Sequence, residues 1–485
     1  MPSKRRFLAI LLAAACGLAQ APAVSQIAGR LTANALMADV SFLAADALEG
    51  RGTPSRGLDL AAEYIAAQYR RAGLERAGDD GYFQTAAFAE VTPDPSGFDL
   101  ALEIEGRTIH AQSSAVSQEA PGALDLSRAE AVKVESGPAA LSGLAPEAVR
   151  GKVIVAGPSA AAWTLLALPP EIQPALVILL RSGGRGGHPG PRLSEQTVRG
   201  VPTLAVWDEQ FRTVLGAARP GPLAARISAH IAAPSTTPVK LRNVAGVLRG
   251  SDPALKDTYL LVTAHYDHLG SRGAGPGDRI FNGANDDASG TASVIEIANA
   301  LASLPQRPRR SIVFLTFFGE ELGEVGSQYY VRHPIFPLAR TAADINLEQL
   351  GRTDDSEGPH IGMINLTGFD FTDMPGAFRK AGEEAGIRLV KDEAKSDRYF
   401  AASDNFPFAN SGVPSTTVSV SYEFPDYHQP GDEWAKLDYR NMAKVDHALA
   451  LAVYAIADSV AEPQWNAANP QAQRFAKARG NTEPY

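Results

Sequence analysis

Apolar and polar positions follow one clear pattern over the second half of the chain. From residue 238 onward, unbroken apolar runs at 259–264 ("YLLVTA") and 311–318 ("SIVFLTFF") alternate with segments such as 290–304, whose apolar residues recur at helical spacing. Runs without polar alternation are typical of strands that are covered on both faces. The pattern therefore predicts an α/β domain with a mostly parallel central sheet and helices on both faces.

The first half of the chain has a different pattern. Residues 31–75 show helical spacing on both sides of a Gly- and Pro-rich break at Gly50–Gly57, which predicts two helices joined by a loop. Between residues 105 and 237 the apolar runs become short and strand-like, with Gly, Pro and Ala between them. We therefore expect a β-rich domain at 105–237 that is inserted into a discontinuous α/β domain, 27–104 and 238–460.

Both chain ends differ from these domains. Residues 1–23 combine basic residues at positions 4–6 with an apolar run and then small residues, a pattern typical of a cleaved export signal. The apolar run is shorter than the roughly 20 residues needed to span a bilayer, so we expect a secreted or periplasmic protein without an integral membrane span. Lipid attachment at Cys16, the only cysteine, is the alternative. Residues 461–485 are polar and predict a loosely held C-terminal tail.

Composition limits the class of protein. The chain has 485 residues, of which 45% are hydrophobic and 20% are charged, a profile of folded globular proteins. This length favours two domains over one. The formal net charge of -9, without a block of basic residues, makes nucleic acid an unfavoured partner.

Polar side chains collect at the ends of the predicted strands, where ligands gather in open α/β sheets. Singly, each is explained by hydrogen bonding or helix capping, but together they predict one site. Imidazole and carboxylate groups without sulfur suit zinc or a related divalent ion. The residues are His265, Asp267 and His268 after the first run, Glu320 and Glu321 after the second, Glu348 after "TAADINL", and His428 after "VSVSYEF" and a short loop.

The segment "GANDDASG" at 283–290 adds two adjacent aspartates between glycines. Two histidines and three carboxylates are too many for one tetrahedral zinc, but they suffice for two metals that share Asp286. The glycines let the backbone approach closely, and Ser289 with Gly290 can open the following helix. Two ions about 3.5–4 Å apart can acidify a bridging water and polarise a carbonyl together, which predicts a hydrolase.

The order of these motifs, His-x-Asp, "GANDDASG", Glu-Glu, "INLEQLG" and "YHQPGDEW", resembles the M28 family of dinuclear zinc exopeptidases, which are secreted aminopeptidases and their relatives. The resemblance runs from about residue 35 to 455. The intervening "PEAVRGKVIVAG" and "PALVILL" are similar to the protease-associated (PA) insert that many members carry. It implies the zinc exopeptidase fold, two zinc ions per chain, and peptide or protein substrates.

The resemblance also implies a role for each matching residue. His265 and Glu348 would bind one zinc, Glu321 and His428 the other, and Asp286 would bridge the two. Glu320 would be the general base, and Asp267 would orient a histidine ligand. Tyr427 would stabilise the oxyanion, with an aromatic packing role as the alternative. The chain departs from the common pattern at Glu348, where many members have Asp, and at Ser403–Asn405, where many have Ser-Asp-His.

The leading hypothesis is an aminopeptidase that hydrolyses peptide bonds at free N-termini, preferring apolar side chains. The acid-rich site favours a substrate ammonium group, whereas a C-terminal carboxylate would need an arginine from Arg272, Arg279 or Arg398. A carboxypeptidase-like hydrolase, a glutaminyl cyclase with a single zinc, and an inactive binding protein on the same scaffold remain alternatives. The sequence predicts no oligomeric state.

Overall fold

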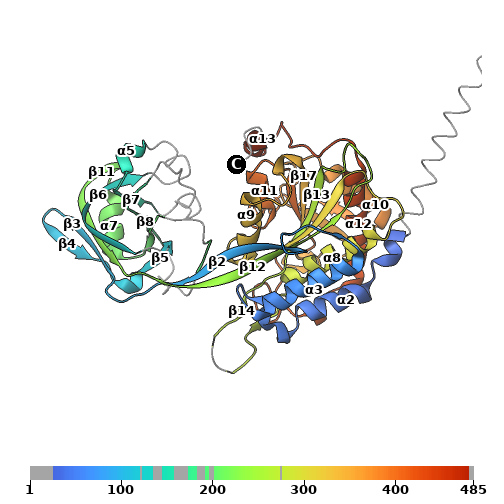
Figure 1. Cartoon of the computed structure of the whole chain (residues 1–485), viewed down its shortest axis with the longest axis horizontal. Coiled ribbons are helices and arrows are strands. Elements are labelled where there is room, and N and C mark those ends of the chain that lie inside the picture. Colours follow the sequence, from blue (N-terminus) through green and yellow to red (C-terminus); the bar gives the residue numbers. More distant parts are fainter. Residues whose placement is uncertain are drawn as a thin grey trace, which may run out of the picture. The chain divides into compact units, whose positions relative to one another are not determined.

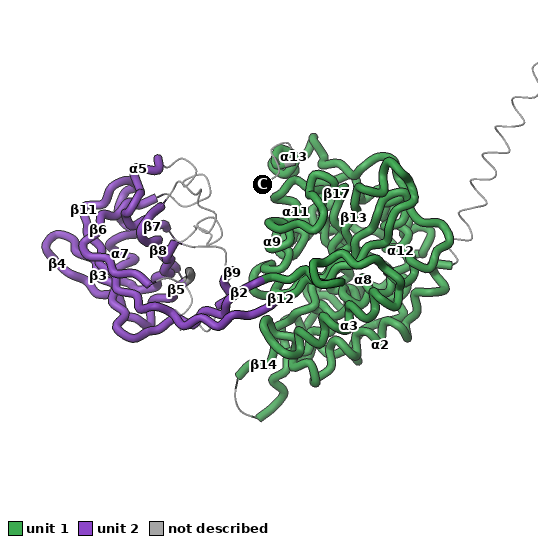
Figure 2. Tube along the Cα trace, in the orientation of Figure 1, with its two compact units in different colours: residues 1–86, 241–485 green, residues 87–240 purple. Residues whose placement is uncertain are grey.

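The chain forms two compact units, residues 1–86 with 241–485 and residues 87–240 (Figure 2). The computed structural model describes residues 26–120, 123–134, 145–157, 173–182, 192–195, 201–273 and 276–479. The predicted export signal and Cys16 lie outside these residues. Among the helices that are described, none combines the length and the apolar character that crossing a membrane requires.

Unit 1 is built on a sheet with the strand order β21-β20-β22-β17-β13-β16-β12-β2 (Figure 1). Its four central strands, β22, β17, β13 and β16, are parallel to one another, as predicted. Antiparallel pairs flank them, β20 with β22 and β12 with β16, so the sheet is mixed. The strands are β2 (Phe83–Thr92), β12 (Ser235–Leu248), β13 (Tyr259–His265), β16 (Ser311–Phe317), β17 (Thr341–Leu347), β20 (Met363–Leu366), β21 (Arg388–Val390) and β22 (Ser415–Ser419).

Helices cover both faces of this sheet (Figure 1). Leu261 and Leu315 point to one face, where they pack with Tyr330 of α9 and Phe408 of α11. Because side chains alternate along a strand, Leu260 points to the other face, where α8 contacts β13 and also packs against α2, α3 and α12. The helices are α2 (Ala33–Leu43), α3 (Arg56–Ala72), α8 (Ser289–Ala302), α9 (Val325–Arg332), α10 (Pro375–Ala385), α11 (Asn405–Asn410), α12 (Tyr439–Asp458) and α13 (Gln473–Arg479).

The two predicted N-terminal helices are α2 and α3. Thr32 caps α2 by accepting from the Ala35 N–H, and Ser55 caps α3 by accepting from the Leu58 N–H. A short helical turn at Asp46–Arg51 precedes the predicted break at Gly50–Gly57 and overlaps its first two residues. A Cβ atom at Gly57 would lie 1.8 Å from the Leu48 carbonyl oxygen, so only glycine lets α3 pass so close to this turn.

Unit 2 is β-rich, as predicted, with the strand order β4-β3-β11-β6-β7-β8-β10-β5. It begins at residue 87 rather than 105, because β3 already pairs with β11. Its similarity to a PA insert stays a prediction. The elements are β3 (Asp99–Ile104), β4 (Arg107–His110), β5 (Val116–Ala120), β6 (Leu124–Val134), α5 (Pro146–Val149), β7 (Val153–Ala156), β8 (Leu176–Leu180), β10 (Thr203–Val206), α7 (Glu209–Ala217) and β11 (Gly221–Ile231).

The C-terminal segment is not a loosely held tail over the residues that the structure describes. Trp465, which precedes α13, and Phe475, which lies in it, are both buried. Their rings stack with centroids 5.1 Å apart, next to Phe400. The Trp465 indole also donates to the Gly412 carbonyl at 2.9 Å. The prediction was wrong here because these two aromatic side chains anchor an otherwise polar segment on unit 1.

Candidate metal centre

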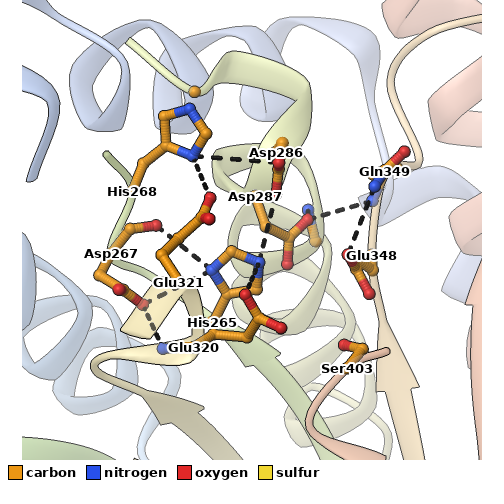
Figure 3. A network of polar contacts seen from close by, with 12 residues as sticks. His265, Asp267, His268, Asp286, Asp287, Glu320, Glu321, Glu348, Gln349 and Ser403 are labelled. Atoms are coloured by element: carbon orange, nitrogen blue, oxygen red, sulfur yellow. Dashed lines mark hydrogen bonds and ion pairs between the residues drawn. The ribbon is translucent and has the colours of Figure 1, made fainter. Parts of the chain in front are cut away.

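The predicted site residues meet at the carboxyl ends of three neighbouring strands of unit 1, β16, β13 and β17 (Figure 3). His265 is the last residue of β13, and Glu348 directly follows β17. Glu320 and Glu321 lie in a short turn, Glu320–Leu322, after β16. Asp286 lies in the turn that leads into α8. The parallel order of the strands therefore brings together side chains that are far apart in the sequence.

The first group of possible metal ligands consists of His265, Asp286 and Glu348, whose ligand atoms all lie within 4.8 Å of one another. His265 Nε2 is 3.3 Å from Asp286 Oδ1. Asp344, which lies within β17, points elsewhere, because its Oδ1 accepts from the Thr263 hydroxyl at 2.9 Å inside the sheet. The structure thus brings Glu348, and not Asp344, to His265.

The second group consists of His268, Asp286 and Glu321, again within 4.8 Å. His268 Nδ1 lies 2.6 Å from Glu321 Oε1. His428, which the sequence predicted as a ligand beside Glu321, also lies here. Its Nε2 is 3.1 Å from Asp286 Oδ2 and 3.2 Å from Glu321 Oε2. Asp286 therefore belongs to both groups, as a bridging ligand must. Three histidines, rather than the predicted two, surround this pair of groups.

Several buried atoms in these groups lie close to one another but make no hydrogen bond of normal geometry, although buried polar atoms in proteins nearly always do. They are His265 Nε2, both ring nitrogens of His268, Asp286 Oδ2 and Glu321 Oε1. All of these atoms belong to side chains of the two groups, and imidazole with carboxylate is a ligand set for zinc and related divalent ions. The residues therefore fit a metal centre.

The charges of the site are also those of a cation-binding centre. Burial raises the pKa of Glu320 well above its usual value, and Asp404, Glu348 and Glu321 raise it further. Burial likewise raises the pKa of Glu348, to about 6. Burial lowers the pKa of His265, but the nearby carboxylates of Asp267 and Asp286 outweigh burial and raise it overall. Burial together with an excess of carboxylates over imidazoles produces these shifts, and bound cations would offset that excess.

Asp267 is placed to orient His265. Its carboxylate Oδ1 lies 3.6 Å from His265 Nδ1, and its backbone carbonyl lies 3.2 Å from the same nitrogen. The Glu320 N–H and the Thr53 hydroxyl donate to the two carboxylate oxygens at 3.1 and 3.2 Å. Holding Nδ1 in this way directs Nε2 toward Asp286 and Glu320, as metal-binding histidines require.

Tyr427 lies beside the site, with its ring stacked on the His428 ring at a centroid distance of 3.9 Å. Burial raises the pKa of its phenol, and Asp286, Glu348, Glu321 and Glu320 raise it further. Tyr427 therefore packs on an aromatic ring, which was the alternative to its predicted oxyanion role. Its phenol is also close enough to the site carboxylates for their charge to raise its pKa.

Comparisons with known proteins agree with this geometry. The model of the family described as "Peptidase family M28" matches residues 243–453, which contain every residue of both groups.

Over residues 243–453 the chain is similar to peptidase family M28.

Two curated relatives are similar to part of this chain. A probable zinc metalloprotease of Pyrenophora tritici-repentis is 27% identical over 266 residues, which cover 47% of this chain and 59% of that protein. Aminopeptidase YwaD of Bacillus subtilis is 27% identical over 219 residues, 44% of each chain. The chain thus spans less than two thirds of the length of either relative. Among solved structures, the aminopeptidase from Aneurinibacillus sp. strain AM-1 has the same fold, with a TM-score of 0.55 at 19% identity, covering 89% of this chain and 95% of that one.

The M28 site also contains residues that the sequence did not assign to it. Asp432 accepts the backbone N–H groups of Asn285 and Asp286 at 3.0 Å and so fixes the loop of the shared aspartate. Asp287 Oδ1 accepts from the N–H groups of Gly290 and Gln349 at 2.9 and 3.2 Å, which ties α8 to the segment after Glu348. Asp432 lies in the same motif as His428, "YHQPGDEW", and this closeness in sequence could have indicated that Asp432 belongs to the site.

The departure from the common family pattern at Ser403–Asn405 lies beside this site. Asn405 Oδ1 accepts from the Thr417 hydroxyl at 2.8 Å, and its amide donates to the Phe400 carbonyl at 3.0 Å. Asn405 is therefore held by the scaffold, and its side chain is used in hydrogen bonds of the sheet.

Proposed function

We propose that the protein is a dinuclear zinc aminopeptidase, which hydrolyses the first peptide bond of substrates with a free N-terminus. The observation that carries the proposal is that two groups of ligands share Asp286, with Glu320 beside them. The match to peptidase family M28 and the zinc metalloprotease and aminopeptidase names of the relatives support it.

Two zinc ions would be held by His265 and Glu348 on one side, by Glu321 and His428 on the other, and by Asp286 between them. His268 adjoins the second set. When bound, the ions supply the Lewis acidity that lowers the pKa of a water molecule and polarises the substrate carbonyl.

Glu320 is the residue that would move the proton. Its Oε2 lies 3.9 Å from His265 Nε2, so the carboxylate faces the region where the metal ligands converge. Burial and neighbouring carboxylates raise its pKa, so it holds a proton more readily than an exposed glutamate. It can therefore accept the proton of the attacking water and pass it to the leaving amine. Its backbone N–H, which donates to Asp267, keeps this turn in place.

The charged groups near the site favour the amino end of a substrate. The three arginines that could bind a C-terminal carboxylate are exposed and have partners near them in the sequence. Arg272 donates to the Leu269 carbonyl, Arg279 donates to the Gly273 carbonyl, and Arg398 lies over the Tyr399 ring. Buried carboxylates surround the ligands instead, and they attract an α-ammonium group.

Exposed side chains beside the site suit a substrate whose N-terminal residue has an apolar side chain. Leu322, which follows Glu321, is 49% exposed, and Tyr427, which precedes His428, is 43% exposed. Exposed apolar side chains next to functional residues are typical of sites that bind apolar groups. We also propose that the protein is exported, because of the pattern of residues 1–23.

Metal reconstitution tests the dinuclear proposal. Chelator-treated protein would be titrated with zinc while hydrolysis of an aminoacyl chromogenic amide and bound zinc are followed together. We expect activity to need two zinc ions per chain. Full hydrolysis at one zinc per chain would overturn the dinuclear centre. Binding of a single zinc without hydrolysis would favour a cyclase-like enzyme or a binding protein.

A further inference from the structure

Arg51 is a fully buried arginine that lies outside both groups of metal ligands. Its guanidinium donates to four backbone carbonyls: Nε to Tyr266 at 2.8 Å, Nη1 to Leu43 at 2.5 Å and to Asn282 at 2.7 Å, and Nη2 to Gly283 at 2.9 Å. These carbonyls lie on three separate segments of the chain. Two of the segments carry metal ligands, because Tyr266 follows His265 and Gly283 precedes Asp286 by three residues.

Neighbours of Arg51 strengthen the same connection. The His268 N–H donates to the Arg51 carbonyl at 3.3 Å, and the Thr53 hydroxyl donates to Asp267 at 3.2 Å. Asn282, whose carbonyl accepts from Arg51, donates in turn to the Ala44 carbonyl at 2.8 Å. The segment before α3 is thus bonded both to the loop after β13 and to the loop before α8.

The backbone around Arg51 adopts a conformation that is rare in proteins. Glu49, Gly50 and Arg51 have φ angles of 49°, 70° and 49°, in the left-handed region that residues other than glycine avoid. A Cβ atom at Gly50 would lie 2.4 Å from the Phe281 carbonyl oxygen, so the segment passes directly against the chain that leads to Asp286. This conformation directs the Arg51 side chain into the protein.

The charge of Arg51 also suits this position. Burial lowers the pKa of its guanidinium to about 10, against the attraction of Asp267, Asp432, Asp287 and Asp286. The side chain therefore remains charged at neutral pH. It places one fixed positive charge near the buried carboxylates, while its hydrogen bonds go to uncharged carbonyl oxygens.

We propose that Arg51, assisted by Thr53, is a positioning residue that sets the spacing between the loop of His265 and the loop of Asp286. The inference rests on the proposed metal-dependent function. A planar guanidinium with five N–H donors can make all four of these hydrogen bonds in a fixed geometry, whereas an ammonium group has only three donors and no fixed fork. Residues that orient metal ligands in this way typically contribute about 10–100-fold to metal affinity.

The test compares Arg51→Lys, which keeps the charge, and Arg51→Met, which removes it, with a matched control. Arg310 is also buried, at 1% exposure, and donates to two backbone carbonyls, those of Ser459 and Val460 at the end of α12. Arg310→Lys therefore removes a similar buried arginine at a position without metal ligands. Zinc affinity is measured by competition with a chelator, the visible spectrum of the cobalt-substituted protein reports ligand geometry, and melting temperature reports stability.

We expect both Arg51 variants to bind zinc about 10–100-fold more weakly and to show an altered cobalt spectrum, while Arg310→Lys loses only melting temperature. Wild-type zinc affinity and cobalt spectrum in the Arg51 variants would overturn the proposal, and so would full recovery by lysine, which would assign the effect to charge alone. If neither variant folds, Thr53→Val decides, since unchanged zinc affinity there contradicts the proposal. Failure of the proposed function is seen separately, as a wild-type protein that binds no zinc.

Discussion

His268 Nδ1 lies 2.6 Å from Glu321 Oε1, while His428 Nε2 lies 3.2 Å from the other oxygen of the same carboxylate. Glu321 is therefore held between two histidines. The His268 side chain is fully buried, whereas that of His428 is 35% exposed. A fully buried histidine whose Nδ1 faces the carboxylates of Glu321 and Asp286 needs a chemical reason, and a metal ion next to Glu321 supplies one.

The first prediction concerns these two histidines. We expect both His268→Ala and His428→Ala to weaken binding of the second zinc by about 10–100-fold, because each contacts Glu321. His110→Ala, an exposed histidine of unit 2 that pairs with Asp99, is the control and should leave zinc binding unchanged. Zinc content after dialysis against a chelator is the measurement. Two tightly bound zinc ions in His268→Ala would reduce His268 to a packing role.

The second prediction separates the base from the ligands. Glu320→Ala should keep both zinc ions and the fold while reducing kcat by about 10²–10⁴-fold, the usual contribution of a positioned general base. Zinc content and kcat are measured on the same preparation. A missing zinc ion in this variant would show that Glu320 is itself a ligand.

The third prediction concerns the two acids of β17 and its carboxyl end. Glu348→Ala should release the zinc ion that His265 binds, because Glu348 completes that group. Asp344→Asn should retain both ions, since its carboxyl accepts from Thr263 and burial raises its pKa well above the usual value, so that an amide replaces it closely. Metal analysis decides between them. If the Asp344 variant loses zinc and the Glu348 variant keeps it, the order of ligands along this strand is wrong.

The fourth prediction concerns pH and a buried carboxyl away from the metal centre. Burial raises the pKa of Asp39 in α2 to about 7, with Glu296 raising it further and the Tyr64 hydroxyl opposing the rise. The folded state then holds this proton more tightly than the unfolded chain. Stability that is present below about pH 4 is therefore lost as the pH rises to about 7.

Asp39→Asn should remove this loss. Three pH units at about 1.36 kcal/mol each set an upper limit of about 4 kcal/mol, so we expect a gain of about 2–4 kcal/mol at pH 8 and none at pH 4. The unfolding midpoint of metal-free protein across this range is the measurement, and Asp257→Asn, at an exposed position, is the control. A gain that is the same at every pH would show that Asp39 is ionised in the folded protein.

Much of the candidate site could be predicted because its residues follow strands. Apolar runs mark where β13, β16 and β17 end, and parallel neighbours bring those ends together. The antiparallel flanks of the sheet depend on long-range pairing, which the local pattern does not contain. His268 was visible beside His265, but adjacent polar residues after a strand do not show which of them turn inward.

Arg51 and Asp432 could not be assigned from the sequence for a different reason. Both act through backbone groups, Arg51 on carbonyls and Asp432 on N–H groups, and backbone partners leave no pattern of side chains. The C-terminal segment was predicted from its average polarity, whereas Trp465 and Phe475 bury their rings in an aromatic cluster of unit 1. Single large aromatic residues can outweigh the composition of a segment.

Blocking the substrate amine shows whether the protein acts on free N-termini. The rates of hydrolysis of a leucine-initiated dipeptide and of its N-acetylated form would be compared on protein with its zinc content measured. We expect rapid cleavage of the free peptide and a loss of at least about 10²-fold in kcat/KM on acetylation, since removing a charged group from an acidic site costs about 3 kcal/mol or more. Equal cleavage of the two peptides would contradict an aminopeptidase.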